Sequence, residues 1–466
     1  MVDPRSWPHR PPPEPPATWP DRPPVWPVDP GDLVDDEPPG PRRRPRWVAV
    51  VAIGLVVALV AAYGSQALIG DDDPVVAAPG TTLDPPDTTQ PAPSTTPPPP
   101  GSMPPSTGPP ANDDPPADPP SELQAEVDEL VDFVEQARES EFVTDPLVEF
   151  YDDAGFEQRV VETFLDEETL ELTEIEGKLY HALGLLDPEV SLLDLTQDLL
   201  ASGVVGFYDP ETAELAVRGT DLDPYVASTV VHELVHALDD QLHDLDRPEW
   251  DELTIDESNA VTSVVEGDAR RVEAEWIATL DEVERSEYAG GEARAAGDAD
   301  YSNFPDWLVQ LLLAPYELGE GLVDGLDSEA EVDALFEDPP ESTEQVMDPQ
   351  AFTADEQPLP VPVPSADGVV VDEGTLGALM LYVMVFDRVG VAEATSLSSG
   401  WGGDAYVVYE KGDRVCITLD VVGDSAGDTA TITSSLRAYA AASGADASVE
   451  TVGGGNPQLN SCTTAS

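Results

Sequence analysis

An uncharged apolar run spans residues 47–69 of the 466-residue chain and divides it into two unequal parts. Arginines at positions 42–44 and 46 precede the run, and three aspartates at 71–73 follow it. A run of this length can cross the hydrocarbon core of a bilayer as one helix. Because basic residues favour the cytoplasmic side, we expect a single-pass transmembrane helix. It would leave the N-terminus in the cytoplasm and the rest of the chain outside the cell.

Proline-rich tracts flank the apolar run on both sides. Residues 1–46 offer little apolar surface to bury, so we expect a disordered cytoplasmic tail. Residues 70–120, rich in proline and threonine, are expected to form an extended stalk. A cleaved signal peptide is the alternative to a membrane anchor, since Ser65, Gln66 and Ala67 form a small-x-small cleavage site. The long leader and the length of the run favour the anchor.

Acidic residues dominate the part of the chain that follows the apolar run. This part holds 86 of the 94 aspartates and glutamates, but only 13 of the 20 lysines and arginines. The negative electrostatic potential of these residues repels nucleic acid phosphates and anionic lipid head groups. Binding to nucleic acid is therefore not expected as the main function. The charge favours solubility, and binding of cations or basic partners is the alternative.

From residue 121 onward the sequence has a globular composition with regular apolar periodicity. Ser121 and Gln124 fit a capping box at the start of a helix. Residues 204–218 predict two strands joined by a turn, and residues 405–421 predict a hairpin turning at Gly412. A helix near 426–442 and a short strand follow. The pattern predicts an α+β fold: a mainly helical domain over 121–400 with a small antiparallel sheet, and a C-terminal α+β hairpin lobe over 401–466.

The two cysteines of the chain, Cys416 and Cys462, both lie in this C-terminal lobe. In an oxidising compartment a disulfide between them would stabilise the fold by about 3–4 kcal/mol, because it closes a loop of intermediate length. Two buried thiols are the alternative.

A histidine motif lies in the sequence "VVHELVHALDDQLH", which holds three of the five histidines of the chain. His232 and His236 are spaced i and i+4 on a predicted helix that begins with Asp223 and Pro224. This spacing stacks two imidazoles on one face, where they can share a zinc ion. Glu233 lies beside them and can act as a general base on the attacking water. Surface histidines are the alternative, but the apolar flanks favour a buried helix.

The third protein ligand has to come from elsewhere in the chain. His243 returns to the same helical stripe, but lies about 10 Å further along the axis. The pattern with a third histidine six residues after the second does not fit either, since Leu242 stands there. A distant carboxylate remains.

A second predicted helix, over residues 256–280, offers several carboxylates for this role. Glu266 shares a face with Glu273 and is ranked first, Glu257 near the helix start second, and Glu273 third. Asp268 falls on the apolar stripe, so it needs a partner, and the free N–H of a metal-bound histidine is the one we expect. The spacing alone does not decide among them.

These segments resemble a group of poorly characterised bacterial gluzincin-type metalloproteins, through "HELVHALDDQ" followed by "VVEGDA". Weaker similarity extends to "GFYDPETAEL", "PPESTEQVMDP" and "GWGGDAYVVY". The resemblance covers roughly residues 203–409 and implies Zn²⁺ held by His232, His236 and Glu266, with Glu233 as the general base. We expect the zincin-like domain to span 121–400. The group often has histidine where Asp348 stands here, so the resemblance assigns that position no role.

Together the residues and the resemblance predict a membrane-anchored zinc metallopeptidase acting on a peptide or protein outside the cell. The hairpin at 204–218 would bind the substrate as an added strand, and Tyr316 is a candidate oxyanion donor. A cell-surface binding module with a structural or vestigial zinc site is the alternative, in which the stalk and the segments "STEQ" at 342–345 and "GWGGD" at 400–404 would contact a partner. A zinc hydrolase acting on cell-wall components is a third.

Overall fold

The computed structural model of the chain describes residues 121–298 and 304–464. The expected cytoplasmic tail, transmembrane helix and stalk, over 1–46, 47–69 and 70–120, lie outside the described residues. Within the described part, no helix combines the length and the apolar character needed to cross a membrane.

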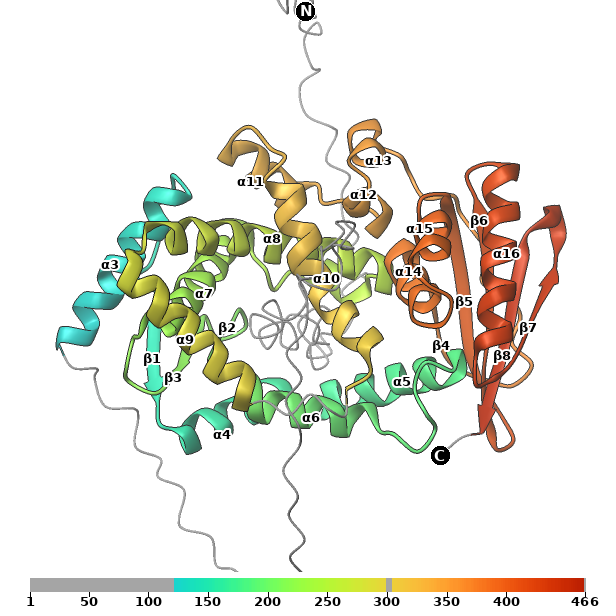
Figure 1. Cartoon of the computed structure of the whole chain (residues 1–466), viewed down its shortest axis with the longest axis horizontal. Coiled ribbons are helices and arrows are strands. Elements are labelled where there is room, and N and C mark those ends of the chain that lie inside the picture. Colours follow the sequence, from blue (N-terminus) through green and yellow to red (C-terminus); the bar gives the residue numbers. More distant parts are fainter. Residues whose placement is uncertain (1–120, 299–303, 465–466) are drawn as a thin grey trace, which may run out of the picture. The chain divides into compact units, whose positions relative to one another are not determined.

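The described residues form a mixed α+β fold with two separate sheets, so the α+β part of the prediction is confirmed (Figure 1). The elements are α3 (Ser121–Ala137), β1 (Leu147–Tyr151), α4 (Asp153–Phe164), α5 (Glu167–Leu183), α6 (Leu192–Gly203), β2 (Gly206–Asp209), β3 (Glu214–Arg218), α7 (Pro224–His243), η2 (Pro248–Glu252), α8 (Ile255–Thr279), α9 (Glu282–Asp298), α10 (Asp306–Val323), α11 (Glu329–Glu337), α12 (Thr343–Met347), α13 (Pro349–Ala354), β4 (Val369–Gly374), α14 (Gly377–Arg388), α15 (Val391–Ser398), β5 (Trp401–Lys411), β6 (Arg414–Gly423), α16 (Ala426–Ala442), β7 (Asp446–Thr451), η4 (Gly453–Gly455) and β8 (Pro457–Thr464).

The first sheet has three strands in the order β1-β3-β2. Strands β2 and β3 form the antiparallel hairpin expected before the histidine helix. Strand β1 was not expected, and it pairs with β3 in parallel, so the prediction of a purely antiparallel sheet was wrong. Its partner lies more than sixty residues further along the chain, and no turn signal marks such a distant pairing.

The second sheet has five strands in the order β4-β5-β6-β8-β7, all antiparallel to their neighbours. Its central hairpin turns at Gly412, whose φ of 69° favours glycine. Helix α16 begins and ends where the sequence predicted. Strand β4 belongs to this sheet as well, so the sheet extends to the N-terminal side of the boundary expected between residues 400 and 401.

A disulfide joins Cys416 of β6 to Cys462 of β8, which lie directly opposite each other in the register of the two strands. Their Cα atoms are 4.1 Å apart. The bridge therefore ties the last strand of the chain to the middle of the five-stranded sheet.

The three largest groups of buried hydrophobic residues make up most of the core in the described part of the chain. The largest joins α4, α5, α6, α10 and α14 to the five-stranded sheet. A second joins α8 to α10, α11 and α12. The third packs α7 between α3, the β2–β3 hairpin and α8. Helix α8 contributes to two of these groups, so its position relative to α7 is set by packing on both sides.

Candidate metal centre

Helix α7 carries both histidines of the motif and is held in the core. The Asp223 carboxylate accepts hydrogen bonds from the backbone N–H groups of Tyr225 and Val226, at 3.0 and 3.1 Å, and caps the helix start as predicted. Val230, Val231, Leu234, Val235 and Leu238 are fully buried against the hairpin, α3 and α8. This packing holds α7 in place, and its neighbouring face places His232 and His236 against Glu266 of α8.

Helix α8 begins at a capping box and passes very close to α10. The Thr254 hydroxyl accepts from the Glu257 N–H, and the Glu257 carboxylate accepts from the Thr254 N–H. A Cβ atom on Gly319 of α10 would lie 1.9 Å from the carbonyl oxygen of Ser263, so only glycine permits this approach. The close packing of α8 on α10 presents Glu266 to α7.

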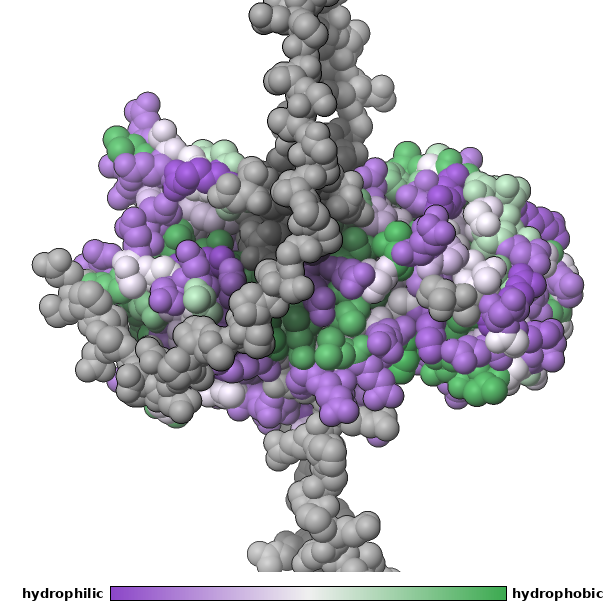
Figure 2. Space-filling model, turned by 90° about the horizontal axis from the view of Figure 1, so that it is seen from below, coloured by the Kyte–Doolittle hydropathy of each residue, from purple (hydrophilic) through white to green (hydrophobic). Residues whose placement is uncertain are grey.

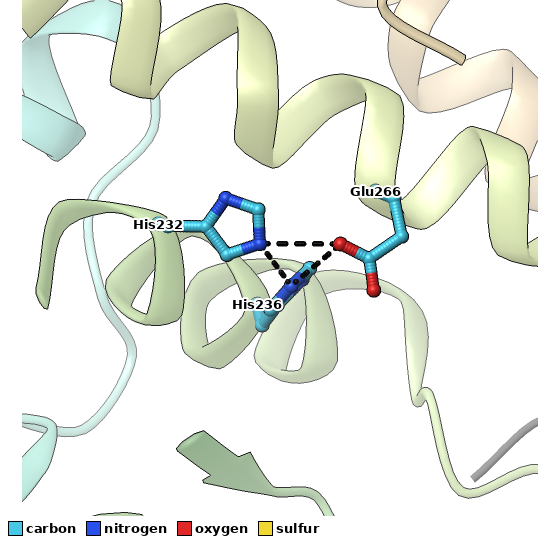
Figure 3. Close-up of side chains that lie close together, drawn as sticks. All are labelled: His232, His236 and Glu266. Carbon is cyan, nitrogen blue, oxygen red and sulfur yellow. Dashed lines mark hydrogen bonds and ion pairs between the residues drawn. The ribbon is translucent and has the colours of Figure 1, made fainter. Parts of the chain in front are cut away.

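The side chains of His232, His236 and Glu266 converge on one point between α7 and α8 (Figure 3). The two Nε2 atoms are 3.1 Å apart. The Oε2 atom of Glu266 is 3.1 Å from Nε2 of His232 and 3.5 Å from Nε2 of His236. The exposed fractions of the three residues are 4%, 3% and 0%.

The spacing of these three atoms fits a tetrahedral zinc site. With zinc bonds of about 2.0–2.1 Å, two ligand atoms of a tetrahedron are about 3.3 Å apart, and the three observed separations lie on both sides of that value. The second carboxylate oxygen, Oε1 of Glu266, is buried and has no hydrogen-bond partner among the described residues. Two imidazoles and a carboxylate are also donors that zinc prefers.

Burial and the neighbouring charges shift the pKa values of all three residues in this cluster. Burial opposes the charged form of His232, but the hydrogen bond to Glu266 and the contact with the Glu273 carboxylate raise its pKa to about 10. Burial lowers the pKa of His236. For Glu266, burial acts against ionisation, yet the charges and hydrogen bonds of the two histidines lower its pKa to about 2. The carboxylate is therefore ionised and available as a ligand at neutral pH.

Glu233, the predicted general base, is fully buried beside the cluster. Its Oε2 atom accepts a hydrogen bond of 3.0 Å from the backbone N–H of Tyr208 on strand β2. Its Oε1 atom has no partner among the described residues. Burial raises the pKa of Glu233 to about 8. This carboxyl group can therefore take up a proton near neutral pH. Sequence reasoning missed the role of Tyr208, because a backbone N–H leaves no signal in the side-chain pattern.

Glu273 contacts the outer nitrogen of His232. Its Oε2 atom lies 3.4 Å from Nδ1 of His232 and 2.6 Å from a guanidinium nitrogen of Arg270. The sequence ranked Glu273 as a third candidate ligand, since it shares a face of α8 with Glu266. The structure instead places it behind the histidine, where a carboxylate orients the ring.

Asp268 has a different partner from the one expected. Its Oδ2 atom forms an ion pair of 2.7 Å with Nε of Arg138, and Arg271 donates to its Oδ1 at 2.8 Å. Arg138 is itself 1% exposed and also donates to Asp239 of α7 at 2.8 Å. The predicted contact of Asp268 with a histidine N–H was wrong. Arg138 follows α3 and approaches from a distant part of the sequence, so the pattern of α8 could not show it.

The remaining sequence candidates lie away from the cluster. Glu257 belongs to the capping box of α8, more than two turns before Glu266. His243 ends α7 and stacks on Phe336 of α11, with ring centroids 4.5 Å apart. Asp348 caps α13 and accepts a hydrogen bond from the N–H of Gln350.

Tyr316 of α10 lies at the edge of the cluster formed by His232, His236 and Glu266. Its ring is nearly parallel to that of His232, with centroids 6.0 Å apart. Burial, followed by the charges of Glu266 and Glu233, raises the pKa of Tyr316 well above its usual value. The hydroxyl therefore keeps its proton and can donate a hydrogen bond at the site.

The segments at 339–349 and 400–409 meet at a buried junction. Thr343 of α12 donates its backbone N–H to the Asp256 carboxylate at the start of α8, at 2.9 Å. Asp404 of β5 accepts from the indole N–H of Trp401 and from the N–H of Leu376 before α14. These side chains are at most 3% exposed. They join α8, α12, α14 and β5, and they do not present a surface to a partner.

Comparison with known proteins gives one match. Residues 365–459 match the model of a domain of unknown function, DUF8575, and this region runs from just before β4 into β8. It covers well under half of the chain and excludes His232, His236 and Glu266. No curated protein and no solved structure matches the chain.

Proposed function

We propose that the chain is a zinc-dependent metallopeptidase that holds Zn²⁺ through His232, His236 and Glu266. One observation carries the proposal: three zinc-preferring donor atoms lie 3.1–3.5 Å apart on two packed helices, with the free carboxylate oxygen of Glu233 beside them. A zincin-like architecture of the helical part and a gluzincin-type ligand set belong to the same proposal.

Zinc bound there would polarise the scissile carbonyl and make a water molecule more acidic. Residues of the chain would transfer the proton and stabilise the negative charge that develops. Glu233 accepts the proton of the attacking water and delivers it to the leaving amine, and burial, which raises its pKa, makes it a stronger base than an exposed carboxylate. The Tyr208 N–H orients this carboxylate. The protonated Tyr316 hydroxyl donates to the oxygen on which negative charge develops.

We also propose that the peptidase is anchored by residues 47–69 and acts outside the cell. The uncharged run with arginines on one side supports the anchor. The disulfide between Cys416 and Cys462 supports an oxidising compartment, because such bonds are rare in the cytosol. The substrate is then a peptide or protein of the extracellular space.

A second candidate function is a binding module with a structural zinc site. The observation that favours it is burial, since each of His232, Glu233, His236 and Glu266 is at most 4% exposed, and structural sites are closed. Against it stands Glu233, because a structural site does not need a carboxylate that is not a ligand. Peptide cleavage requires that the cluster become accessible to substrate.

The test compares the full chain with its Glu233→Gln variant, using Glu275→Gln on the exposed side of α8 as the control. Zinc content and cleavage of a peptide library are measured on each. We expect zinc in all three proteins, cleavage by the wild type and the control, and a rate at least about 100-fold lower for Glu233→Gln. Equal rates in wild type and Glu233→Gln would contradict the proposal. A zinc-loaded wild type that cleaves nothing would favour the binding module.

A further inference from the structure

An apolar cavity lies between α5, α6, α8 and α10, apart from the metal ligands. Figure 2 shows hydrophobic residues gathered in the middle of the face seen from below, the side on which Figure 1 places α5 and α6. Leu172, Leu179, Leu199, Leu308 and Leu311 supply much of its wall. Its volume is about 90 Å³. An engineered cavity of about 150 Å³ binds benzene, so this one suits an aliphatic group of the size of a valine or leucine side chain.

One polar group on the cavity wall lacks a partner. Ser258 of α8 is 3% exposed, and its hydroxyl makes no hydrogen bond among the described residues. The other polar groups of the wall are used within the protein. Thr173 and Thr196 donate to backbone carbonyls of their own helices, and Asn259 donates to the carbonyl of Ile255. A buried hydroxyl without a partner is unfavourable, so Ser258 is available to a bound molecule.

The cavity and the metal cluster share the same two helices. Asn259 at the cavity and Glu266 at the cluster are seven residues apart on α8, two turns along one face and about 10 Å along the axis. On α10, Leu312 at the cavity is one turn before Tyr316 at the cluster. An extended peptide advances about 3.3 Å per residue, so this distance corresponds to about three residues of substrate.

We propose that this cavity is a specificity site for the substrate of the peptidase. It takes an aliphatic side chain about three residues from the cleaved bond, while the Ser258 hydroxyl donates a hydrogen bond to a backbone carbonyl of the same peptide. The inference rests on the proposed function for its link to catalysis, but the binding of an aliphatic side chain can be measured separately.

The first experiment uses a peptide that the wild type cleaves, with alanine or leucine at each position three residues from the cleaved bond. We expect kcat/KM to be at least about tenfold higher for leucine at one of these positions. Leu172→Trp, at the half-buried rim of the cavity, should remove this preference by filling the space. Val161→Trp, on the exposed surface of α4, is the matched control and should keep it. A preference that survives Leu172→Trp would overturn the proposal.

The second experiment needs no catalysis. Saturation-transfer NMR would measure the binding of N-acetyl-leucinamide and N-acetylglycinamide to the full chain, with zinc and after chelation. We expect binding of the leucine compound alone, retained in Val161→Trp, weakened in Ser258→Ala and lost in Leu172→Trp. Binding without any peptide cleavage would refute the proposed activity and support the cavity as a binding site. Absence of binding to the wild type, or binding that persists in Leu172→Trp, would overturn the inference.

Discussion

Replacing Arg138 with alanine is expected to weaken the contact between α7 and α8, the two helices that carry the proposed metal ligands. The guanidinium group reaches Asp239 of α7 at 2.8 Å and Asp268 of α8 at 2.7 Å. The side chains of all three residues are 0% exposed. Asp239 lies three residues after His236, and Asp268 lies two residues after Glu266. Arg138 therefore links α7 and α8 within one turn of their ligands.

The expected loss of stability follows from burial. Removing one partner of a buried ion pair destabilises a protein by about 3–5 kcal/mol, because the other charge is left without compensation. Here Asp239 loses its buried counter-ion, while Asp268 keeps its ion pair with Arg271 at 2.8 Å, so we expect a value within that range. Arg414→Ala is the matched control. Its ion pair with Asp446, at 3.0 Å, is exposed on both sides, and such pairs contribute about 0–1 kcal/mol.

Urea unfolding of the metal-free chain, followed by tryptophan fluorescence, measures this difference. A second variant removes the three fully buried charges, with Arg138→Met, Asp239→Asn and Asp268→Asn, and leaves Arg271 paired with Glu329 at 2.8 Å. It should recover most of the loss, because neutral side chains need no counter-ion. A loss below about 1 kcal/mol for Arg138→Ala, similar to the control, would refute the reasoning.

Three further predictions concern separate parts of the structure. Glu273→Gln should weaken zinc affinity by about 10–100-fold, measured by chelator competition, because it removes the carboxylate behind His232; Glu275→Gln should leave the affinity unchanged. Burial raises the pKa of Asp256 to about 7, so the folded chain keeps a proton that the unfolded chain releases, and wild-type stability should fall as pH rises from about 4 to 7. Asp256→Asn should flatten this slope by about 1.4 kcal/mol per pH unit, measured by urea unfolding at several pH values, and an unchanged slope would contradict the reasoning. Cys416→Ser should lower the free energy of unfolding by about 3–4 kcal/mol relative to the oxidised wild type, with no difference once both are reduced.

Features that depend on neighbouring residues could be predicted from the sequence. Asp223 and Pro224 mark the start of α7 because a helix cap is a local structure. The two hairpins were predictable because a turn and its flanking strands follow one another in the chain. The i and i+4 histidines share a face for the same reason. The assignment of Glu257 to a helix start also used only nearby residues.

Features that depend on distant packing could not be predicted. Strand β1 pairs with β3 across several helices, and neither segment signals the other. Asp268 stood on an apolar stripe and needed a partner, but its partner Arg138 follows a helix 130 residues earlier. Glu266 and Glu273 share one face of α8, so periodicity could not tell which approaches the histidine Nε2 atoms. The way in which α7 packs across α8 decides which of the two carboxylates reaches the Nε2 atoms.

Zinc stoichiometry tests the central claim most directly. The full chain and its Glu266→Ala and Glu257→Ala variants would be loaded with zinc, freed of excess by gel filtration and analysed by mass spectrometry. The structure predicts one zinc ion per chain in the wild type and in Glu257→Ala, and little or none in Glu266→Ala. Equal zinc content in wild type and Glu266→Ala would contradict the metal centre proposed here.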